Sequence, residues 1–266
     1  MEVEAVLWQR IISALVGIPL VILLSYMGGN WFFIAVGIII LLGLYEYGNM
    51  VTNRGYGMPK ISGYLSGLLI ISAAVFPDFA AFGVFFLIIL LHALFIIMGR
   101  AAFDEMAFSF AGILLFAWTL SHLILIRETF PQGFYYILLC FIITWSTDTG
   151  AYFCGRFFGR HKLSPVISPN KTVEGALGGT LFCVLVVFAL KGFFLNISLH
   201  ILVSLSVLAS FVGQAGDLLE SAVKRWAGVK DSGSLIPGHG GILDRFDSLT
   251  LVAPLLYYFL KPFLIG

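Results

Sequence analysis

The sequence predicts an all-α protein: a polytopic transmembrane helix bundle of about nine helices, with a polar cavity that opens to the cytoplasmic face. Composition is the first reason. Of the 266 residues, 60% are hydrophobic and 11% are charged, and the mean hydropathy is +1.01, which nearly excludes a soluble fold. The second reason is a series of apolar runs about 20 residues long, the length at which a helix crosses a bilayer. The third is that 9 of the 29 formal charges fall within the 31 residues 217–247.

Short polar breaks separate the apolar runs. Gly28-Gly29-Asn30, Pro77-Asp78 and Pro131-Gln132-Gly133 are typical of turns. The breaks predict helices at about 9–27, 31–51, 61–76, 79–98, 105–126, 133–155, 172–194, 197–220 and 248–264. Because further helices follow the first one directly, we expect it to be a membrane helix and not a cleaved signal.

The basic residues are distributed unevenly between the two ends of these helices. One side receives 12 of the 15: Arg10, Arg54, Lys60, Arg100, Arg156, Arg160, Lys162, Lys171, Lys224, Arg225, Lys230 and Arg245. The other side receives Arg127, Lys191 and Lys261. Because the positive side stays inside, the majority side is predicted to face the cytoplasm. This predicts an integral protein of the cytoplasmic (inner) membrane with its N-terminus inside, its C-terminus outside, and both polar segments, 156–171 and 221–247, on the cytoplasmic face.

Ionisable residues divide the chain into two parts with different expected roles. Residues 1–130 are predicted to form scaffold helices, and residues 131–266 are predicted to form the catalytic helices. In the first part His92 and His122 are expected to be packing residues on apolar helices. Glu46 lies near the cytoplasmic end of the second helix, where it could pair with a basic loop residue or line the site.

A polar stripe marks the end of the eighth predicted helix. Asp217, Glu220, Ser221 and Lys224 are spaced i, i+3, i+4 and i+7, so they lie on one helical face. Such a face is not tolerated against lipid and is expected to line a polar cavity. The alternative is an internal ion-pair network. Two glycines just upstream, at positions 213 and 216, allow a neighbouring helix or a substrate to approach closely.

Two further carboxylates open the last helix. Asp244 and Asp247 are spaced i, i+3, and acidic residues are also favoured there as helix caps. Together with Asp217 they favour a divalent metal site. Mg²⁺ prefers oxygen ligands and is commonly held by one or two carboxylates plus phosphate oxygens. The pattern leaves open a second cation, and the lack of a His/Cys cluster argues against zinc.

The segment between the charged helices is rich in glycine. In PGHGG, residues 237–241, the glycines permit unusual backbone angles around His239. Their exposed N–H groups could bind an anion, although a simple tight turn fits equally well. Further upstream, Asp148 ends a buried run and Tyr152 follows it. Lys171 precedes a helix N-terminus with Glu174 in its first turn, which is a favourable place for phosphate. A topological anchor combined with a helix cap is the alternative.

These segments together resemble the phosphatidate cytidylyltransferase (CDP-diacylglycerol synthase) family. The resemblance is carried by SAVKR at 221–225, KD at 230–231, IPGHGG at 236–241 and DRFD at 244–247. Upstream, DTGAY at 148–152 and SPNKTVEG at 168–175 also resemble that family. The resemblance implies transfer of CMP from CTP to phosphatidate with release of pyrophosphate, in a Mg²⁺-dependent reaction. It also implies a homodimer, with no nucleic acid among the partners.

The candidate site follows from the residue chemistry and from the resemblance. The catalytic candidates are Asp217, Lys224, Arg225, Lys230, Asp231, Asp244 and Asp247, of which Asp217, Asp244 and Asp247 are the candidate metal ligands. The candidates for binding substrate or cofactor are Asp148, Tyr152, Asn170, Lys171, Glu174, Ser221, His239 and Arg245. Two alternatives remain: a CTP-dependent polyprenol or phytol kinase, and a Mg²⁺ or anion transporter. A transporter site is expected near the membrane midplane, whereas the charges here cluster toward one face.

Overall fold

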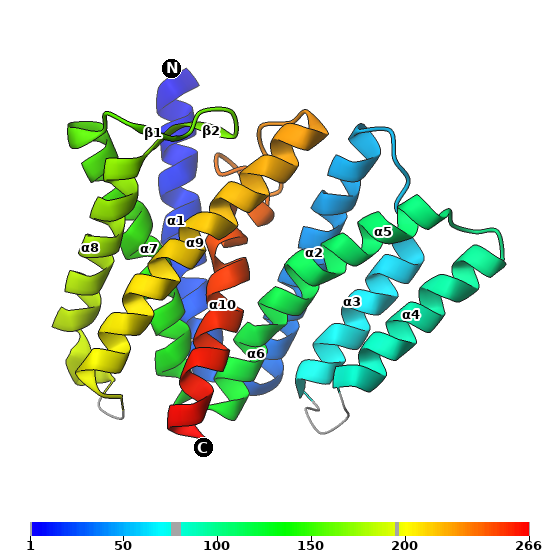
Figure 1. Ribbon diagram of the computed structural model, residues 1–266, viewed down its shortest axis with the longest axis horizontal. Helices are drawn as coiled ribbons and strands as arrows, with labels where there is room; N and C mark the ends of the chain where they lie inside the picture. Colours follow the sequence, from blue (N-terminus) through cyan, green and yellow to red (C-terminus); the bar gives the residue numbers. More distant parts are fainter. Residues whose placement is uncertain (1, 76–80, 195–196, 266) are drawn as a thin grey trace. The chain divides into compact units, whose positions relative to one another are not determined.

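The computed structural model describes residues 2–75, 81–194 and 197–265, and most of them are helical (Figure 1). The helices are α1 (Glu2–Met27), α2 (Gly29–Asn53), α3 (Lys60–Val75), α4 (Ala81–Ile97), α5 (Phe103–Gly112), α6 (Thr119–Thr129), α7 (Gly133–Phe158), α8 (Val173–Ala189), α9 (Leu199–Ala227) and α10 (Leu243–Leu264). A π-helical segment, η1 (Ile113–Trp118), joins α5 to α6, and a 3-10 turn, η2 (Lys191–Phe193), follows α8.

The predicted helices and the observed ones correspond one to one. The predicted helix at 105–126 is α5, η1 and α6 in direct succession, with the π-helical segment in the middle. The prediction was too short for 197–220, because α9 continues through the polar stripe to Ala227. The predicted turn at Pro77-Asp78 lies outside the described residues.

The apolar helices fit a helical membrane protein. Among the described residues, four helical stretches are long and apolar enough to cross a membrane: Gly29–Asn53, Phe103–Thr129, Gly133–Phe158 and Leu199–Ala227. Shorter apolar helices cover Ile11–Met27, Lys60–Ala74, Gly83–Ile97 and Val173–Ala189. The all-α class is confirmed, while the polar cavity and its cytoplasmic opening stay predictions.

The chain forms two compact units. The first unit contains Met1–Glu128 and Trp226–Arg245, and the second contains Thr129–Arg225 and Phe246–Gly266. The segment 226–245, which holds much of the motif, therefore groups with the N-terminal helices.

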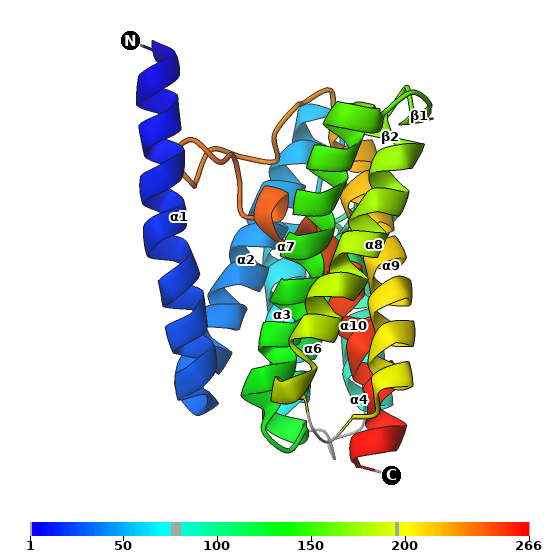
Figure 2. The same ribbon diagram turned by 90° about the vertical axis from the view of Figure 1, so that its left-hand side faces the viewer.

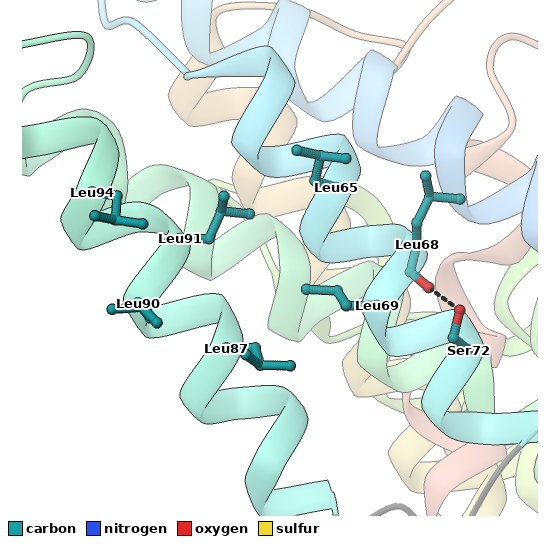
Figure 3. Close-up of a pocket in the computed structure, with 8 residues that line it drawn as sticks. All are labelled: Leu65, Leu68, Leu69, Ser72, Leu87, Leu90, Leu91 and Leu94. Atoms are coloured by element: carbon teal, nitrogen blue, oxygen red, sulfur yellow. Dashed lines mark hydrogen bonds between the residues drawn. The ribbon is translucent and has the colours of Figure 1, made fainter. Parts of the chain in front are cut away.

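An apolar pocket of about 420 Å³ lies between α3 and α4 in the first unit (Figure 3). Its lining consists of Leu65, Leu68, Leu69, Ser72, Leu87, Leu90, Leu91 and Leu94. The hydroxyl of Ser72 donates to the carbonyl oxygen of Leu68 at 2.8 Å, so even this polar group is used within its own helix. The lining offers no charge for a phosphate or a metal, and the candidate site has to lie elsewhere.

In the second unit, α7 and α8 pack side by side over much of their length (Figure 2). Small residues make this possible. A Cβ atom added at Gly179 would lie 2.6 Å from the carbonyl oxygen of Thr147, and one added at Gly150 would lie 3.0 Å from the Cα of Gly179. Close backbone contact of this kind is how small residues join helices in a bilayer.

Two short strands connect α7 to α8. β1 (Lys162–Ser164) pairs antiparallel with β2 (Ser168–Thr172), with Lys162 opposite Thr172 and an irregularity between the strand ends. At the end of β2 the hydroxyl of Thr172 accepts a hydrogen bond from the N–H of Gly175 at 3.1 Å and caps α8. The predicted helix start at residue 172 is thus confirmed, and the hairpin places Lys171 directly before it.

Candidate functional site

The candidate site in the second unit is built where α9 and α10 touch. A Cβ atom at Gly216 would lie 2.8 Å from the carbonyl oxygen of Asp247, and one at Gly213 would lie 3.0 Å from Val252 Cγ2. The predicted close approach of a neighbouring helix is confirmed. Because Asp217 follows Gly216 directly, this contact brings the start of the polar stripe beside Asp247.

Asp247 feels the charges of other acidic side chains. Its charge is opposed by those of Asp217, Glu220 and Asp148, which come from α9 and α7. Asp247 is part-buried, and the N–H of Ser248 donates to its Oδ1 at 2.6 Å. Like charges that lie near one another repel, and a cation bound among them would relieve that repulsion.

The stripe on α9 is confirmed as a single helical face with bonds along it. The Nζ of Lys224 lies 2.5 Å from the Oε2 of Glu220, and both side chains are nearly buried, 10% and 2% exposed. The hydroxyl of Ser221 donates to the Oδ1 of Asp217 at 3.4 Å. Because Lys224 has an acidic partner in Glu220, these contacts also fit the alternative to a polar cavity, which is an internal ion-pair network.

Lys171 reaches the stripe from β2. Its Nζ lies 2.5 Å from the Oδ2 of Asp217, and both side chains are 26% exposed. The structure therefore unites two predicted site residues that are 46 positions apart in the chain. It places a positive charge against a candidate metal ligand.

Two other predicted binding residues hold the hairpin. Glu174 accepts hydrogen bonds from the backbone N–H groups of Arg160 at 3.0 Å and of His161 at 3.1 Å, and it pairs with the His161 ring at 2.5 Å. Arg225 donates from Nε to the carbonyl oxygen of Ile167 at 3.3 Å. Through these hydrogen bonds both side chains stabilise the β1–β2 connection that carries Lys171.

The remaining candidates of the second unit lie on its surface. Asp148 and Asn170 are exposed, and Tyr152 is 58% exposed. The hydroxyl of Tyr152 accepts a hydrogen bond from Arg156 at 2.8 Å, one turn further along α7.

The glycine-rich segment in the first unit is a tight turn. Gly238 and Gly240 have φ angles of +74° and +79°, which favour glycine. The N–H of His239 donates to the carbonyl oxygen of Ile236 at 2.9 Å, and the Nδ1 of His239 lies 2.6 Å from the hydroxyl of Ser13 on α1. In Figure 2 this loop, drawn in orange, reaches α1.

Asp244 is tied to the same segment. Its Oδ2 accepts hydrogen bonds from the N–H groups of Ser232 at 2.9 Å and Gly241 at 2.8 Å. Two N–H groups of the turn, those of His239 and Gly241, are thus used inside the protein. A nest for phosphate would have to use others. Lys230, Asp231 and Arg245 are exposed on this segment.

The described residues contain no group of three His, Cys, Asp or Glu side chains arranged to hold a metal ion directly. The pairing that the second unit does supply is that of Asp217 and Asp247. Oxygen donors of this kind suit Mg²⁺, which needs only one or two carboxylates when phosphate oxygens and water complete its shell. The residues therefore fit such an ion.

Sequence reasoning left the role of Glu46 open. Glu46 is 1% exposed, and it accepts hydrogen bonds from the backbone of the motif segment, from Ile242 N–H at 2.8 Å and Leu243 N–H at 3.0 Å. A lone acidic residue in an apolar helix was the available signal, since such a residue needs partners. The contact between α7 and α8 was also missed, although the glycines at 150, 175, 178 and 179 were visible in the sequence.

The fold and the charged groups define a class: an integral membrane protein whose polar residues pair carboxylates with lysine ammonium groups. The profile of the cytidylyltransferase family matches residues 8–263, and the chain belongs to that family. The resemblance inferred from the motif is thereby confirmed, and with it an enzyme of the nucleotidyltransferase type.

Relatives agree with this assignment. The phosphatidate cytidylyltransferase of Staphylococcus aureus (strain COL) is 39% identical over 257 residues, which cover 93% of this chain and 96% of the relative. That of Staphylococcus haemolyticus (strain JCSC1435) is 37% identical over 253 residues, with the same coverage of 93% and 96%. That of Staphylococcus epidermidis (strain ATCC 35984) is 55% identical over 130 residues, 48% of this chain and 50% of the relative.

Proposed function

We propose that this enzyme transfers CMP from CTP to phosphatidate and so makes CDP-diacylglycerol and pyrophosphate for phospholipid synthesis. The observation that carries the proposal is the similarity to phosphatidate cytidylyltransferases over nearly the whole of both chains. The motif at 221–247 supports it, because the residues of that motif supply the charges that the reaction needs.

The reaction is a displacement at phosphorus. A phosphate oxygen of phosphatidate attacks the α-phosphorus of CTP and forms a new P–O bond. The bond from the α-phosphorus to the oxygen bridging to the β-phosphorus breaks, and pyrophosphate leaves with that electron pair. Because the nucleophile is already anionic, no general base is required. The protein has to supply position and charge neutralisation.

In the proposal, Asp217 and Asp247 hold a Mg²⁺ ion. Asp244, the third ligand that the sequence predicts, lies in the first unit, where its Oδ2 accepts hydrogen bonds from the loop. When bound, the ion would neutralise phosphate charge and polarise the α-phosphoryl group.

The cations of the second unit would bind the phosphates. Lys171 is the foremost candidate, because its ammonium already lies beside Asp217 and its side chain is part-exposed. Transfer of this charge from Asp217 to an incoming phosphate would replace one charge-assisted contact by another. Lys224 and Arg225 complete the proposed set in this unit, and Lys230, in the first unit, is a further candidate. The bilayer delivers phosphatidate from the side, and CTP arrives from the cytoplasm.

The test is a product assay on detergent-purified protein with CTP, phosphatidate and Mg²⁺, followed by omission of each in turn. We expect CDP-lipid and pyrophosphate only when all three are present. Release of CDP together with a phosphorylated lipid alcohol would instead identify the polyprenol or phytol kinase. Ion flux in proteoliposomes without nucleotide chemistry would identify a transporter.

A further inference from the structure

The geometry points to Glu46 as a positioning residue that holds the motif segment 228–245 in its working conformation from a distant helix. This inference rests on the proposed function for its catalytic part. Glu46 lies on α2, and its bonds to the segment join residues that are 186 to 197 positions apart in the chain.

The carboxylate of Glu46, on α2, caps the N-terminus of a different helix, α10. Its Oε1 accepts from Ile242 N–H at 2.8 Å, and its Oε2 accepts from Leu243 N–H at 3.0 Å. These two N–H groups stand at the start of α10, where no carbonyl of the preceding turn is available to them. A negative charge at a helix N-terminus is also favoured by the helix dipole. Glu46 therefore fixes where α10 begins, and with it the position of Asp244 in its first turn.

Two glycines of the motif are explained by the same carboxylate. A Cβ atom at Gly233 would lie 2.6 Å from the Oε1 of Glu46, and one at Gly241 would overlap both oxygens of Glu46. Neither glycine has a positive φ angle, so backbone conformation does not require glycine at either position. The available space requires glycine at both positions, because the loop backbone has to approach the buried side chain of Glu46 closely.

Ser232 links Glu46 to Asp244. Its hydroxyl lies 2.9 Å from the Oε2 of Glu46 and 3.0 Å from the Oδ2 of Asp244. A hydroxyl has one proton, so it can donate to only one of the two carboxylates at a time. The backbone N–H groups of Ser232 and Gly241 complete the set around Asp244. The orientation of Asp244 thus depends on a loop that Glu46 holds, while Glu46 itself is buried away from solvent.

The first experiment measures hydrogen exchange and turnover in the full-length protein in detergent. Glu46→Gln replaces one acceptor oxygen with an amide donor that faces backbone donors. We expect the amides of the 228–245 peptides to exchange about tenfold faster or more, and kcat for CDP-lipid formation to fall about tenfold or more, each roughly the effect of one lost charge-assisted hydrogen bond. The KM for CTP should stay within about threefold, because three of the four proposed phosphate-binding cations, Lys171, Lys224 and Arg225, lie outside this segment.

The matched control is Glu128→Gln. Glu128 also accepts one backbone hydrogen bond, from Gly29 N–H at 3.0 Å, but it lies on α6 and does not bond to the motif segment. This variant should leave both readouts at the wild-type level. Wild-type exchange in Glu46→Gln would overturn the inference. So would faster exchange with an unchanged kcat, which would make Glu46 a structural cap alone.

A second experiment remains decisive if Glu46→Gln fails to fold. Gly233→Ala should lower kcat, because the new methyl group meets the carboxylate of Glu46. In the Glu46→Asp background the carboxylate is withdrawn by one methylene, so the same glycine substitution should cost at least about threefold less. Gly17→Ala, where a Cβ meets nothing within 4 Å, is the control. Additive effects would refute the contact. If the wild type made no CDP-lipid, the proposed function would fail, while the exchange data would still judge the role of Glu46.

Discussion

Lys224 combines two roles that a pair of substitutions can separate. It is a proposed phosphate ligand, and in the structure it is the partner of a buried carboxylate, with 2.5 Å between its Nζ and the Oε2 of Glu220. Lys224→Met removes the ammonium and leaves the carboxylate of Glu220, which is 2% exposed, without it. Breaking a buried pair from one side costs about 3–5 kcal/mol. At about 2–4 °C per kcal/mol, the melting temperature should fall by roughly 6–20 °C.

The double variant Lys224→Met/Glu220→Gln tests the reasoning. Replacing both charges should recover most of the lost stability, because no buried charge is then left without its counter-ion. Turnover of CTP should stay low in the double variant, because the phosphate contact is still missing. The assay is thermal unfolding in detergent, followed by intrinsic fluorescence, beside pyrophosphate release. Lys261→Met on α10 is the control. Its ammonium lies 5.6 Å from the Tyr257 ring centroid, and its loss should cost about 1 kcal/mol or less.

Two outcomes would refute this account. If the losses of the single variants simply add in the double variant, the two groups do not form an energetic pair. If the double variant turns over CTP at the wild-type rate, Lys224 has no contact with substrate.

Three further predictions concern the same unit. Asp247→Asn should abolish measurable pyrophosphate release. It should leave the melting temperature equal or higher, because three acidic neighbours no longer face a like charge. Pyrophosphate release at the wild-type rate would exclude the metal role. Lys171→Ala should lower kcat/KM for CTP roughly 10- to 150-fold, the value of a charge-assisted contact worth about 1.5–3 kcal/mol, whereas the exposed Lys162→Ala should change it little. Gly216→Ala should lower both the melting temperature and turnover, because its methyl group would lie 2.8 Å from the carbonyl oxygen of Asp247. Gly17→Ala should have no such effect, and equal behaviour of the two variants would contradict the close contact of α9 and α10.

The helices could be predicted from the sequence because hydropathy and turn residues act locally. Apolar runs bounded by Gly28-Gly29 or Pro131-Gln132-Gly133 place helix ends within a few residues. The predicted C-terminal end of α9 was too early, because bilayer thickness limits a predicted membrane helix to about 20 residues. Residues 221–227, SAVKRWA, contain no glycine or proline and include the good helix formers Ala, Lys and Arg, so the helix continues through them.

Partners that are distant in sequence could not be predicted in the same way. The spacing of Asp217, Glu220, Ser221 and Lys224 shows that they share a face, because helical geometry is local. Nothing local indicates that Lys171 pairs with Asp217, or that Glu46 accepts hydrogen bonds from Ile242. The β1–β2 hairpin could not be predicted from the sequence either, because strands of 3 and 5 residues are too short to show an alternating pattern.

The acidic residues sort into two groups by the kind of partner that each one has. Glu46, Glu174 and Asp244 accept hydrogen bonds from backbone N–H groups of loops. A carboxylate used in this way stabilises one loop conformation. Asp217 and Glu220 are instead paired with lysine ammonium groups.

Asp247 has acidic neighbours, and its side chain accepts a hydrogen bond from the N–H of the next residue, Ser248. A lysine can leave a carboxylate when a phosphate arrives, whereas a backbone amide in a folded loop cannot. Exchange of ionic partners is therefore open to Asp217, Glu220 and Asp247 and closed to Glu46, Glu174 and Asp244. On this physical ground Asp217 and Asp247 are the stronger candidates for holding a cation, and Glu46, Glu174 and Asp244 are the residues that keep the surrounding loops in place.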